Sequence, residues 1–294
     1  MINSPLRYPG GKAKMFGFFQ KLLLDCELLG KTYCEPYAGG AGLALQLLSA
    51  GLVEKIRIND IDPGVYAFWK AVKFENERFC ALVQSASLSV DEWRKQKTIL
   101  STPSSSELDR GFAFFYLNRT NRSGIIEGAG PIGGYAQSGK WLIDARFNKE
   151  SLISSIRTIS RFSEQIDISN MDAVKFFKKN INQDSIFYLD PPYYVKGSKL
   201  YRNHYKPEDH AEIRDLLSSM NEQLWILTYD DNDRIRELYS DFDPVEYELI
   251  YSAGKNGLGK EVMFLSNKVC ELVGKHPSIW LSGSERWGVQ RAAS

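Results

Sequence analysis

A short polar stretch that follows an apolar run is the part of the sequence best suited to chemistry. Residues 186–189 are apolar and β-prone, as in a strand that is buried on both faces of a sheet. Pro191 and Pro192 each lack a backbone N–H, so the strand must end there. Asp190, the Pro191 carbonyl and Tyr193 are then presented together at the carboxyl end of the strand, where open α/β sheets bind ligands.

These groups suit an amino group attached to a planar ring. The Asp190 carboxylate and the Pro191 carbonyl are hydrogen-bond acceptors, and together they can accept both protons of an exocyclic amine. Such bonds would direct the nitrogen lone pair toward an electrophile, while Tyr193 offers an aromatic face on which the ring can stack. The alternative is a strand that ends in an ordinary Pro-Pro turn with a solvated aspartate.

A strand, a glycine-rich turn and a helix follow one another earlier in the chain. We expect the strand at residues 31–36, the turn at 37–42 and the helix at 43–50, which is the order of a nucleotide-binding unit. The next strand, at 55–60, ends in Asp60, which suits a bond to ribose hydroxyls. The combination predicts a cofactor site without separating a dinucleotide from another adenosyl cofactor. The alternative is a helix cap and a loop acid.

Two other segments carry weaker signals. Residues 5–12 form a loop by their Pro and Gly content, and Lys12 follows two glycines without the spacing of a phosphate-binding loop. Alone, this pattern indicates a turn before a helix, which we expect at 13–29. Asp172 follows a strand expected at 164–169. A bond to the adenine amino group of a cofactor and an N-cap for the next helix are equally open for it.

Basic residues gather in two segments that we expect to contact nucleic acid. Residues 110–146 carry five Lys or Arg against two acids, a net charge of +3, and include an irregular glycine-rich stretch at 125–140. Asn, Arg and Thr side chains at 118–122 suit phosphates and base edges. Residues 195–206 alternate basic and aromatic side chains without an acid, which suits a nucleic-acid strand. The alternative for both segments is a solvated loop.

The overall composition is that of an ordinary globular protein of 294 residues, with 43% hydrophobic and 25% charged residues and a net charge of +1. That charge argues against a histone-like nucleic-acid binder. The four cysteines and three histidines lack paired metal spacing, so we expect no metal site and a reduced compartment. No apolar run is long enough to span a membrane and no signal peptide begins the chain, so we expect a cytoplasmic location.

The pattern of elements alternates between strands and helices. A helical pattern from 63 to 117 has a break at 101–106, and a further helix is expected at 149–162. Later strands are expected at 185–190, 223–229, 245–250 and 261–266, with a hairpin loop at 252–259. This alternation predicts the α/β class.

In their order, these motifs resemble the Dam-type enzymes, the D12 class of DNA N6-adenine methyltransferases. The resemblance runs from residue 5 to about 267. It rests on residues 6–12, the glycine motif at 35–42, the acid motif at 59–62, the segment 116–124 that begins target recognition, and Asp190-Pro191-Pro192-Tyr193 as the catalytic motif. It implies a Rossmann-like S-adenosylmethionine-dependent methyltransferase fold, a mixed seven-stranded sheet with helices on both faces. It also implies a smaller, mainly helical target-recognition domain.

The resemblance assigns domains and site residues. A discontinuous catalytic domain would span 1–75 and 146–275, with target recognition at 76–145 and a tail at 276–294. S-adenosylmethionine would be the methyl donor and S-adenosylhomocysteine the product. The expected catalytic residues are Asp190, Pro191, Pro192 and Tyr193. The expected cofactor residues are Tyr8, Lys12, Glu35, Pro36, Tyr37, Ala38, Gly39, Gly40, Gly42, Asp60, Asp172 and Asp190. The expected DNA-binding residues are Arg7, Asn118, Arg119, Asn121, Arg122, Ser123, Lys140, Lys196, Lys199 and Arg202.

The implied activity is methyl transfer to N6 of an adenine flipped out of double-stranded DNA, in a prokaryotic or phage setting. The modest size and the absence of heptads suit a monomer. The sequence does not decide between restriction-modification, regulation and phage protection, and it does not identify a partner restriction endonuclease. Arg122, Ser123 and Glu127 stand where GATC-reading enzymes carry aromatic, amide and basic residues, which argues against a simple GATC specificity. Two alternatives stay open. One is transfer to cytosine N4 or to another amine or amide, and the other is a catalytically silent DNA-binding module.

Overall fold

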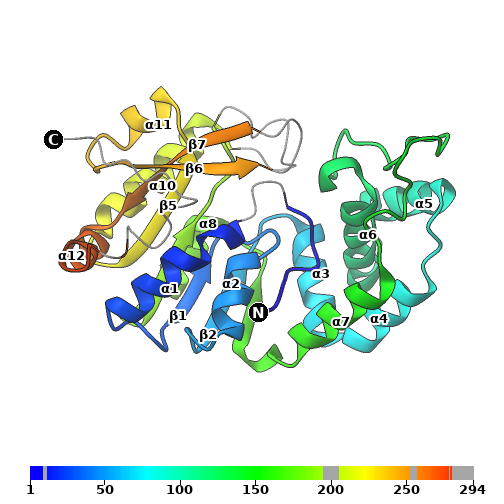
Figure 1. Ribbon diagram of the computed structural model, residues 1–294, viewed down its shortest axis with the longest axis horizontal. Helices are drawn as coiled ribbons and strands as arrows, with labels where there is room; N and C mark the ends of the chain where they lie inside the picture. The colour runs from blue at the N-terminus through cyan, green and yellow to red at the C-terminus, as the bar shows by residue number, and fades with distance from the viewer. Residues whose placement is uncertain (9–11, 195–204, 252–256, 278, 280–294) are drawn as a thin grey trace.

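The structure, a computed structural model, describes residues 1–8, 12–194, 205–251, 257–277 and 279. The described residues form a seven-stranded sheet in the order β3-β2-β1-β4-β5-β7-β6 (Figure 1). The strands are β1 (Thr32–Glu35), β2 (Lys55–Asn59), β3 (Ile166–Ser169), β4 (Ser185–Leu189), β5 (Leu224–Asp230), β6 (Val245–Tyr251) and β7 (Gly257–Leu265). The neighbouring strands β3, β2, β1, β4 and β5 run parallel to one another, whereas β7 is antiparallel to both β5 and β6. The expected α/β class and mixed seven-stranded sheet are confirmed.

Helices cover both faces of this sheet, as expected. In the central strand β4, Ile186 and Tyr188 pack into one core while Phe187 and Leu189 pack into another. Every residue of β4 is buried, which explains why residues 186–189 are apolar without interruption. The first core includes residues of α1 (Phe16–Asp25), α2 (Gly42–Ser49), α3 (Pro63–Phe74) and α12 (Asn267–Lys275). The second includes residues of α8 (Ala173–Asn180), α10 (Pro207–Ser219) and α11 (Asp233–Leu238).

A second group of helices lies beside the sheet. We call α4 (Asn76–Ser85), α5 (Val90–Ser101), α6 (Glu107–Thr120), α7 (Lys149–Ser160) and the segment 121–148 the helical lobe (Figure 1). Helix α6 packs against α3 and α5, and α7 packs against α4. At Gly111 of α6, an added Cβ would lie 2.6 Å from the Ala67 carbonyl oxygen of α3, so only glycine permits this approach. The domain boundaries at 76 and 145 stay a prediction.

Several expected boundaries were wrong in detail. The helix expected at 13–29 begins as a 3-10 turn, η1 (Lys12–Met15), and α1 ends at Asp25, because Glu27 (φ 56°) and Gly30 (φ 75°) are left-handed. The helical run from 63 contains additional breaks at Glu75 and at 86–89. The expected hairpin loop is shorter, because β7 already begins at Gly257, and residues 252–256 lie outside the described residues.

The irregular stretch at 125–140 is confirmed, and within it Pro131 forms an isolated bridge with Asn121. The residues that the structure describes also form two short 3-10 turns, η2 (Arg122–Gly124) and η3 (Ser163–Gln165). Of the tail expected at 276–294, the structure describes residues 276, 277 and 279. Within the described ranges, no helix is long and apolar enough to cross a membrane.

Candidate active site

A cavity of about 340 Å³ lies at the carboxyl ends of the parallel strands β1, β2 and β4. Its wall contains both halves of the site expected from the sequence, the glycine turn with Asp60 and the catalytic motif with Asp190 and Pro192. The expected residues that line it are Tyr8, Lys12, Glu35, Tyr37, Ala38, Gly39, Gly40, Gly42, Asp60, Asp190 and Pro192. The parallel sheet therefore brings together segments that are about 150 positions apart in the chain, as expected for ligand sites at such an edge.

Hydrogen bonds from backbone and side-chain groups fix the conformation of the glycine turn between β1 and α2. Gly39 adopts φ 45° and Ala41 φ 46°, both left-handed. The Gly39 N–H donates to Asp60 Oδ2 at 2.9 Å, and the Trp69 indole N–H donates to the Gly39 carbonyl at 2.9 Å. The Tyr8 ring packs on this turn so closely that an added Cβ on Gly39 would lie 2.6 Å from it. Glycine is thus required both for conformation and for space.

Asp60 sits at the end of β2 and joins the turn to the cavity. Its Oδ1 accepts from the Asp62 N–H at 2.9 Å while Oδ2 accepts from Gly39. Burial raises the pKa of Asp60 to about 7, against the opposing effect of these backbone bonds. Each oxygen keeps a further acceptor position, so the carboxylate can bind hydroxyl groups of a ligand in the cavity.

Glu35, at the end of β1, is a second buried acid on the cavity wall. It is 5% exposed, and the Tyr33 hydroxyl donates to its Oε1 at 2.9 Å. Burial raises the pKa of Glu35 to about 8, and the nearby Asp190 charge acts in the same direction. Beside it, Gln46 Oε1 is buried and has no hydrogen-bond partner within the described residues. The wall thus offers acceptors to a ligand that carries donors or positive charge.

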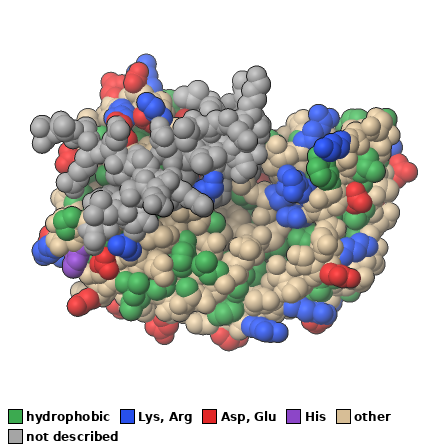
Figure 2. Space-filling model, in the orientation of Figure 1, with side chains coloured by type: hydrophobic (Ala, Val, Ile, Leu, Met, Phe, Trp, Pro, Cys, Tyr) green, Lys and Arg blue, Asp and Glu red, His purple; other side chains and the backbone are tan. Residues whose placement is uncertain are grey.

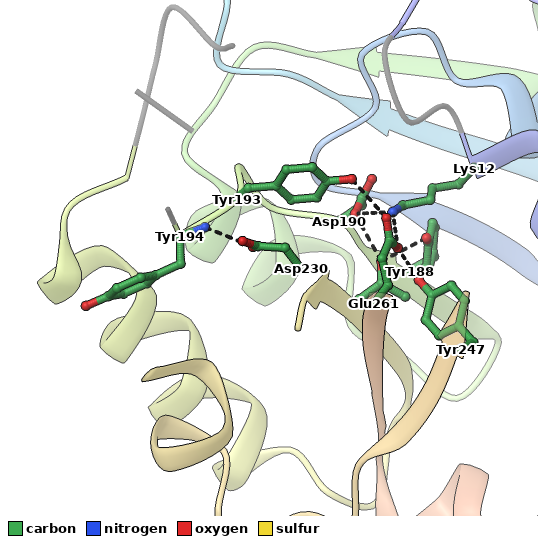
Figure 3. A network of polar contacts seen from close by, with 9 residues as sticks. Lys12, Tyr188, Asp190, Tyr193, Tyr194, Asp230, Tyr247 and Glu261 are labelled. Atoms are coloured by element: carbon green, nitrogen blue, oxygen red, sulfur yellow. Dashed lines mark hydrogen bonds and ion pairs between the residues drawn. The ribbon is translucent and has the colours of Figure 1, made fainter. Parts of the chain in front are cut away.

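The expected catalytic motif begins where β4 ends, and two neighbours hold its aspartate (Figure 3). The Thr228 hydroxyl of β5 donates to Asp190 Oδ1 at 3.0 Å, and the Lys12 ammonium lies 3.3 Å from the same oxygen. Thr228 is itself bonded to the Tyr188 hydroxyl at 2.9 Å. Burial raises the pKa of Asp190 to about 6, while Lys12 opposes that rise. Asp190 is therefore mainly ionised at neutral pH.

Glu261 and Thr228 were missed by the sequence analysis. Glu261 Oε2 lies 2.6 Å from the Lys12 ammonium, and Oε1 accepts from the Tyr193 hydroxyl at 2.9 Å (Figure 3). The Tyr193 side chain is thereby turned toward Glu261, and Tyr193 is not among the residues that line the cavity. One signal for Glu261 was present, a single acid at the start of the apolar run 262–265 of a strand.

Three other expected residues take structural positions. Asp172 caps α8, because its side chain accepts from the Lys175 N–H at 3.0 Å, and it does not line the cavity. Of its two open roles the N-cap is the one observed. The Pro36 carbonyl accepts from the Asn59 side chain at 3.0 Å. Pro191 is buried beside Asp190 without lining the cavity.

Two tyrosines form another part of the cavity wall. The hydroxyls of Tyr37 and Tyr205 are 2.9 Å apart, and both residues line the cavity. Tyr205 was expected to contact nucleic acid, but its ring packs edge-on against Tyr37, with ring centroids 5.7 Å apart. Lys196, Lys199 and Arg202 of the same basic segment lie outside the described residues.

Asn118 and Asn121, expected to bind DNA, are buried, with 1% and 0% exposure. Asn118 accepts from the Arg7 N–H at 2.7 Å and donates to the Arg7 carbonyl at 2.8 Å. Asn121 accepts from the Trp93 indole N–H and donates to the Ile125 carbonyl, both at 2.6 Å. Because the oxygen and nitrogen of each amide are engaged inside the protein, direct DNA contact by these two residues is replaced by a positioning role. They hold the N-terminal segment and the loop after α6.

A cluster of guanidinium groups lies over these asparagines. Arg7 donates to the Asn121 carbonyl at 3.0 Å, and Arg119 donates to the Arg146 carbonyl at 2.6 Å. Burial lowers the pKa of Arg119 to about 10, and the neighbouring charges of Arg7 and Arg146 add to that effect. Lys and Arg side chains also lie on the edge of the helical lobe that faces the hollowed middle of the molecule (Figure 2). Such a concentration of positive charge attracts phosphates.

The remaining expected DNA residues are at the surface of the helical lobe. Arg122 and Ser123 are exposed in η2, where Ser123 is left-handed with φ 57°. Lys140 is exposed, and its ammonium lies 5.7 Å from the centroid of the Trp141 ring, which is itself 64% exposed. These side chains are accessible to a ligand that lies against the lobe.

Comparisons with known proteins agree with this geometry. A family model of the D12 class of N6 adenine-specific DNA methyltransferases matches residues 8–253. The chain belongs to this family. It therefore has the fold of the S-adenosylmethionine-dependent methyltransferases and is an adenine-specific DNA methyltransferase by family. Glu261 lies beyond the matched residues.

Two proteins show the range of similarity. The Type II methyltransferase M.MjaIII of Methanocaldococcus jannaschii is 23% identical over 203 residues, which cover 64% of this chain and 68% of that protein. A solved structure of a conserved hypothetical protein from Streptococcus pyogenes matches with 12% identity and a TM-score of 0.32, over 81% of this chain and 87% of that one. In the described ranges of this D12 methyltransferase, no group of three His, Cys, Asp or Glu side chains is arranged to hold a metal ion.

Proposed function

We propose that this D12 methyltransferase transfers a methyl group from S-adenosylmethionine to N6 of an adenine flipped out of double-stranded DNA. One observation carries the proposal: a single cavity is lined both by the glycine turn with Asp60 and by Asp190. A cofactor seated on the turn would have its reactive end beside the acceptor that receives the target amine. The family of the chain supports the base and the position of transfer.

The residues present fit this cofactor. Asp60 offers carboxylate oxygens for ribose hydroxyls, and Ile61 beside it is 47% exposed and offers an apolar surface for an adenine ring. Glu35 and the Gln46 side-chain oxygen offer acceptors for the amino group of the methionine part. When bound, the cofactor would supply an electrophilic methyl group on a positively charged sulfur, which the ionised Asp190 carboxylate on the cavity wall favours.

In the proposed reaction, the protein binds the target amine and receives its proton. The Asp190 carboxylate and the Pro191 carbonyl accept the two N6 hydrogens, which directs the nitrogen lone pair away from the ring. As N6 would form its bond to the methyl carbon, the carbon–sulfur bond would break and its electron pair would stay on the sulfur. N6 would then carry the positive charge, and one of its protons would pass to the Asp190 carboxylate. Thr228 and Lys12 fix that carboxylate in advance, so little reorganisation is needed at the moment of transfer.

DNA is held, in this proposal, by the basic edge of the helical lobe. The Arg7, Arg119 and Arg146 cluster offers charge for phosphates, and exposed Arg122, Ser123 and Lys140 are candidates for contact with the target sequence. Enzymes that modify a base must first take it out of the stack, because the reacting atom is inaccessible in a duplex. The similarity to a Type II methyltransferase supports a role in restriction-modification.

Incubation of duplex DNA with methyl-labelled S-adenosylmethionine, followed by nucleoside analysis, tests the proposed function. We expect the label in N6-methyladenine, and in fewer counts when the duplex is replaced by single strands of the same sequence. Label in N4-methylcytosine would show that the target amine is cytosine N4 and not adenine N6. Label in protein or RNA alone, or no transfer at all, would contradict the proposal.

The pH profile of methyl transfer should report Asp190. A protonated Asp190 cannot take up the N6 proton and carries no negative charge to hold the amine. The value of kcat/KM for DNA should therefore fall as pH drops through about 6. Lys12 lowers the pKa of Asp190, so Lys12→Met should move this fall to higher pH by about one pH unit or more. Lys14→Met, an exposed lysine in the same 3-10 turn, is the matched control and should leave the profile unchanged. A Lys12→Met profile that coincides with the wild-type profile would refute this assignment.

A further inference from the structure

Two acids on neighbouring strands hold Tyr193, the last residue of the catalytic motif, and Tyr194, which follows it (Figure 3). Asp230 of β5 and Glu261 of β7 are directly opposite one another in the antiparallel register, so their side chains leave the same face of the sheet. Asp230 Oδ1 accepts from the Tyr194 backbone N–H at 3.2 Å. Glu261 Oε1 accepts from the Tyr193 hydroxyl at 2.9 Å. One acid thus holds the backbone after the motif, and the other holds its aromatic ring.

Glu261 is placed where an ionised carboxylate needs several donors. It is 0% exposed, and burial of a charge is unfavourable unless the charge is paired and hydrogen-bonded. Lys12, Tyr193 and the Tyr247 hydroxyl all donate to it. Burial alone would lower the pKa of Lys12, but Asp190 and Glu261 together raise it above its ordinary value. A charged lysine therefore bridges the carboxylate that receives the amine and the carboxylate that holds the tyrosine.

We propose that Glu261 is a positioning residue for methyl transfer, which fixes the Tyr193 ring before the target base arrives. This rests on the proposed function and on the expectation from the sequence that the Tyr193 ring stacks on the target base. A tyrosine ring swings about its first two side-chain torsions, and a bond at the far hydroxyl restricts both torsions at once. Fixing the ring in advance removes an ordering step from base binding. The alternative is that Glu261 only neutralises Lys12 and stabilises the fold.

Two tyrosine variants separate these roles, because each removes one hydroxyl from the same carboxylate. Tyr193→Phe keeps the ring but releases it from Oε1, whereas Tyr247→Phe removes a donor that lies outside the catalytic motif. Base flipping is measured with a duplex that carries 2-aminopurine at the target position. The rate of the chemical step is measured as single-turnover methyl transfer. If Glu261 positions the ring, Tyr193→Phe should slow transfer by roughly ten- to a hundredfold and weaken the flipped-base signal. Its cofactor Kd should stay within about twofold.

Tyr247→Phe, the matched control, should slow single-turnover transfer by no more than about threefold. A double-mutant cycle extends the test: Tyr193→Phe added to Glu261→Ala should slow transfer little further, because the tether is already lost. Thermal unfolding checks that each variant is folded, and the tyrosine pair decides the question even if Glu261→Ala does not fold.

Equal losses in Tyr193→Phe and Tyr247→Phe would overturn the positioning role and leave Glu261 a structural counter-charge. Wild-type rates in Tyr193→Phe would overturn it as well. Both of these outcomes require a wild-type protein that methylates adenine. A wild-type protein that transfers nothing would instead contradict the proposed function, and the positioning role with it.

Discussion

Asp190→Asn should lower single-turnover methyl transfer by about 1,000-fold or more, the upper range for loss of a group that both binds and accepts a proton. Asparagine has nearly the shape of aspartate and can still accept from Thr228 at the 3.0 Å position. It cannot take up the N6 proton. Its amide nitrogen is a hydrogen-bond donor, like the incoming amine, so the two groups cannot bond to each other when they face one another. Lys12, 3.3 Å from Asp190 Oδ1, also loses one of its two counter-charges.

Labelled transfer to duplex DNA at saturating cofactor, with DNA binding measured separately, checks this result. Asp184→Asn is a suitable control, because Asp184 pairs at 3.6 Å with Lys31 and is exposed at the other end of β4. It should transfer at the wild-type rate. Asp190→Asn activity within tenfold of wild type would remove Asp190 from the reaction.

Gly39→Ala should weaken cofactor binding by roughly ten- to a hundredfold, with loss of methylation at ordinary cofactor concentration. Two effects add at this position. Gly39 has φ 45°, a conformation that disfavours a side chain by about 1–2 kcal/mol. The new Cβ would also lie 2.6 Å from the Tyr8 ring, so either the ring or the turn must move. Both line the cavity, and the Gly39 N–H that orients Asp60 moves with the turn.

Gly51→Ala is the matched control for this variant. Gly51 also has a left-handed φ, 68°, but its added Cβ would meet nothing within 4 Å, and the residue does not line the cavity. Both variants should lose about 1 kcal/mol of unfolding free energy or somewhat more, but only Gly39→Ala should change the cofactor Kd in equilibrium dialysis. A similar Kd change in both would assign the effect to general destabilisation. An unchanged cofactor Kd in both variants would show that the glycine turn does not bind the cofactor.

The sequence predicted what depends on local order along the chain. The strand that ends at Pro191, the glycine turn after β1 and the acid after β2 are each encoded within a few residues. Because β1, β2 and β4 are parallel, their carboxyl ends share one edge, so their grouping around a cavity was also predictable. The irregular stretch at 125–140 was visible from its glycine content alone.

What the sequence could not settle is which polar groups are buried and what they meet. Asn118 and Asn121 looked like DNA contacts because amides suit base edges. Helix α6, however, is buried around nearly its whole circumference, and both Asn118 within it and Asn121 at its C-cap are buried. The pairing of Lys12 with Glu261 joins residues 249 positions apart. No short motif encodes such a pair.

The sequence by itself determined the fold class, and it predicted the glycine turn and the acid that we propose to accept the target amine, because backbone chemistry and strand order act locally. Only the tertiary structure decided that Lys12 is shared between Asp190 and Glu261 and that the Tyr193 hydroxyl is tethered. The physical reason is that the interaction of a charge depends on its burial and its neighbours in space. Those were set when the antiparallel strand β7 packed beside β5 and carried Glu261 to the catalytic motif.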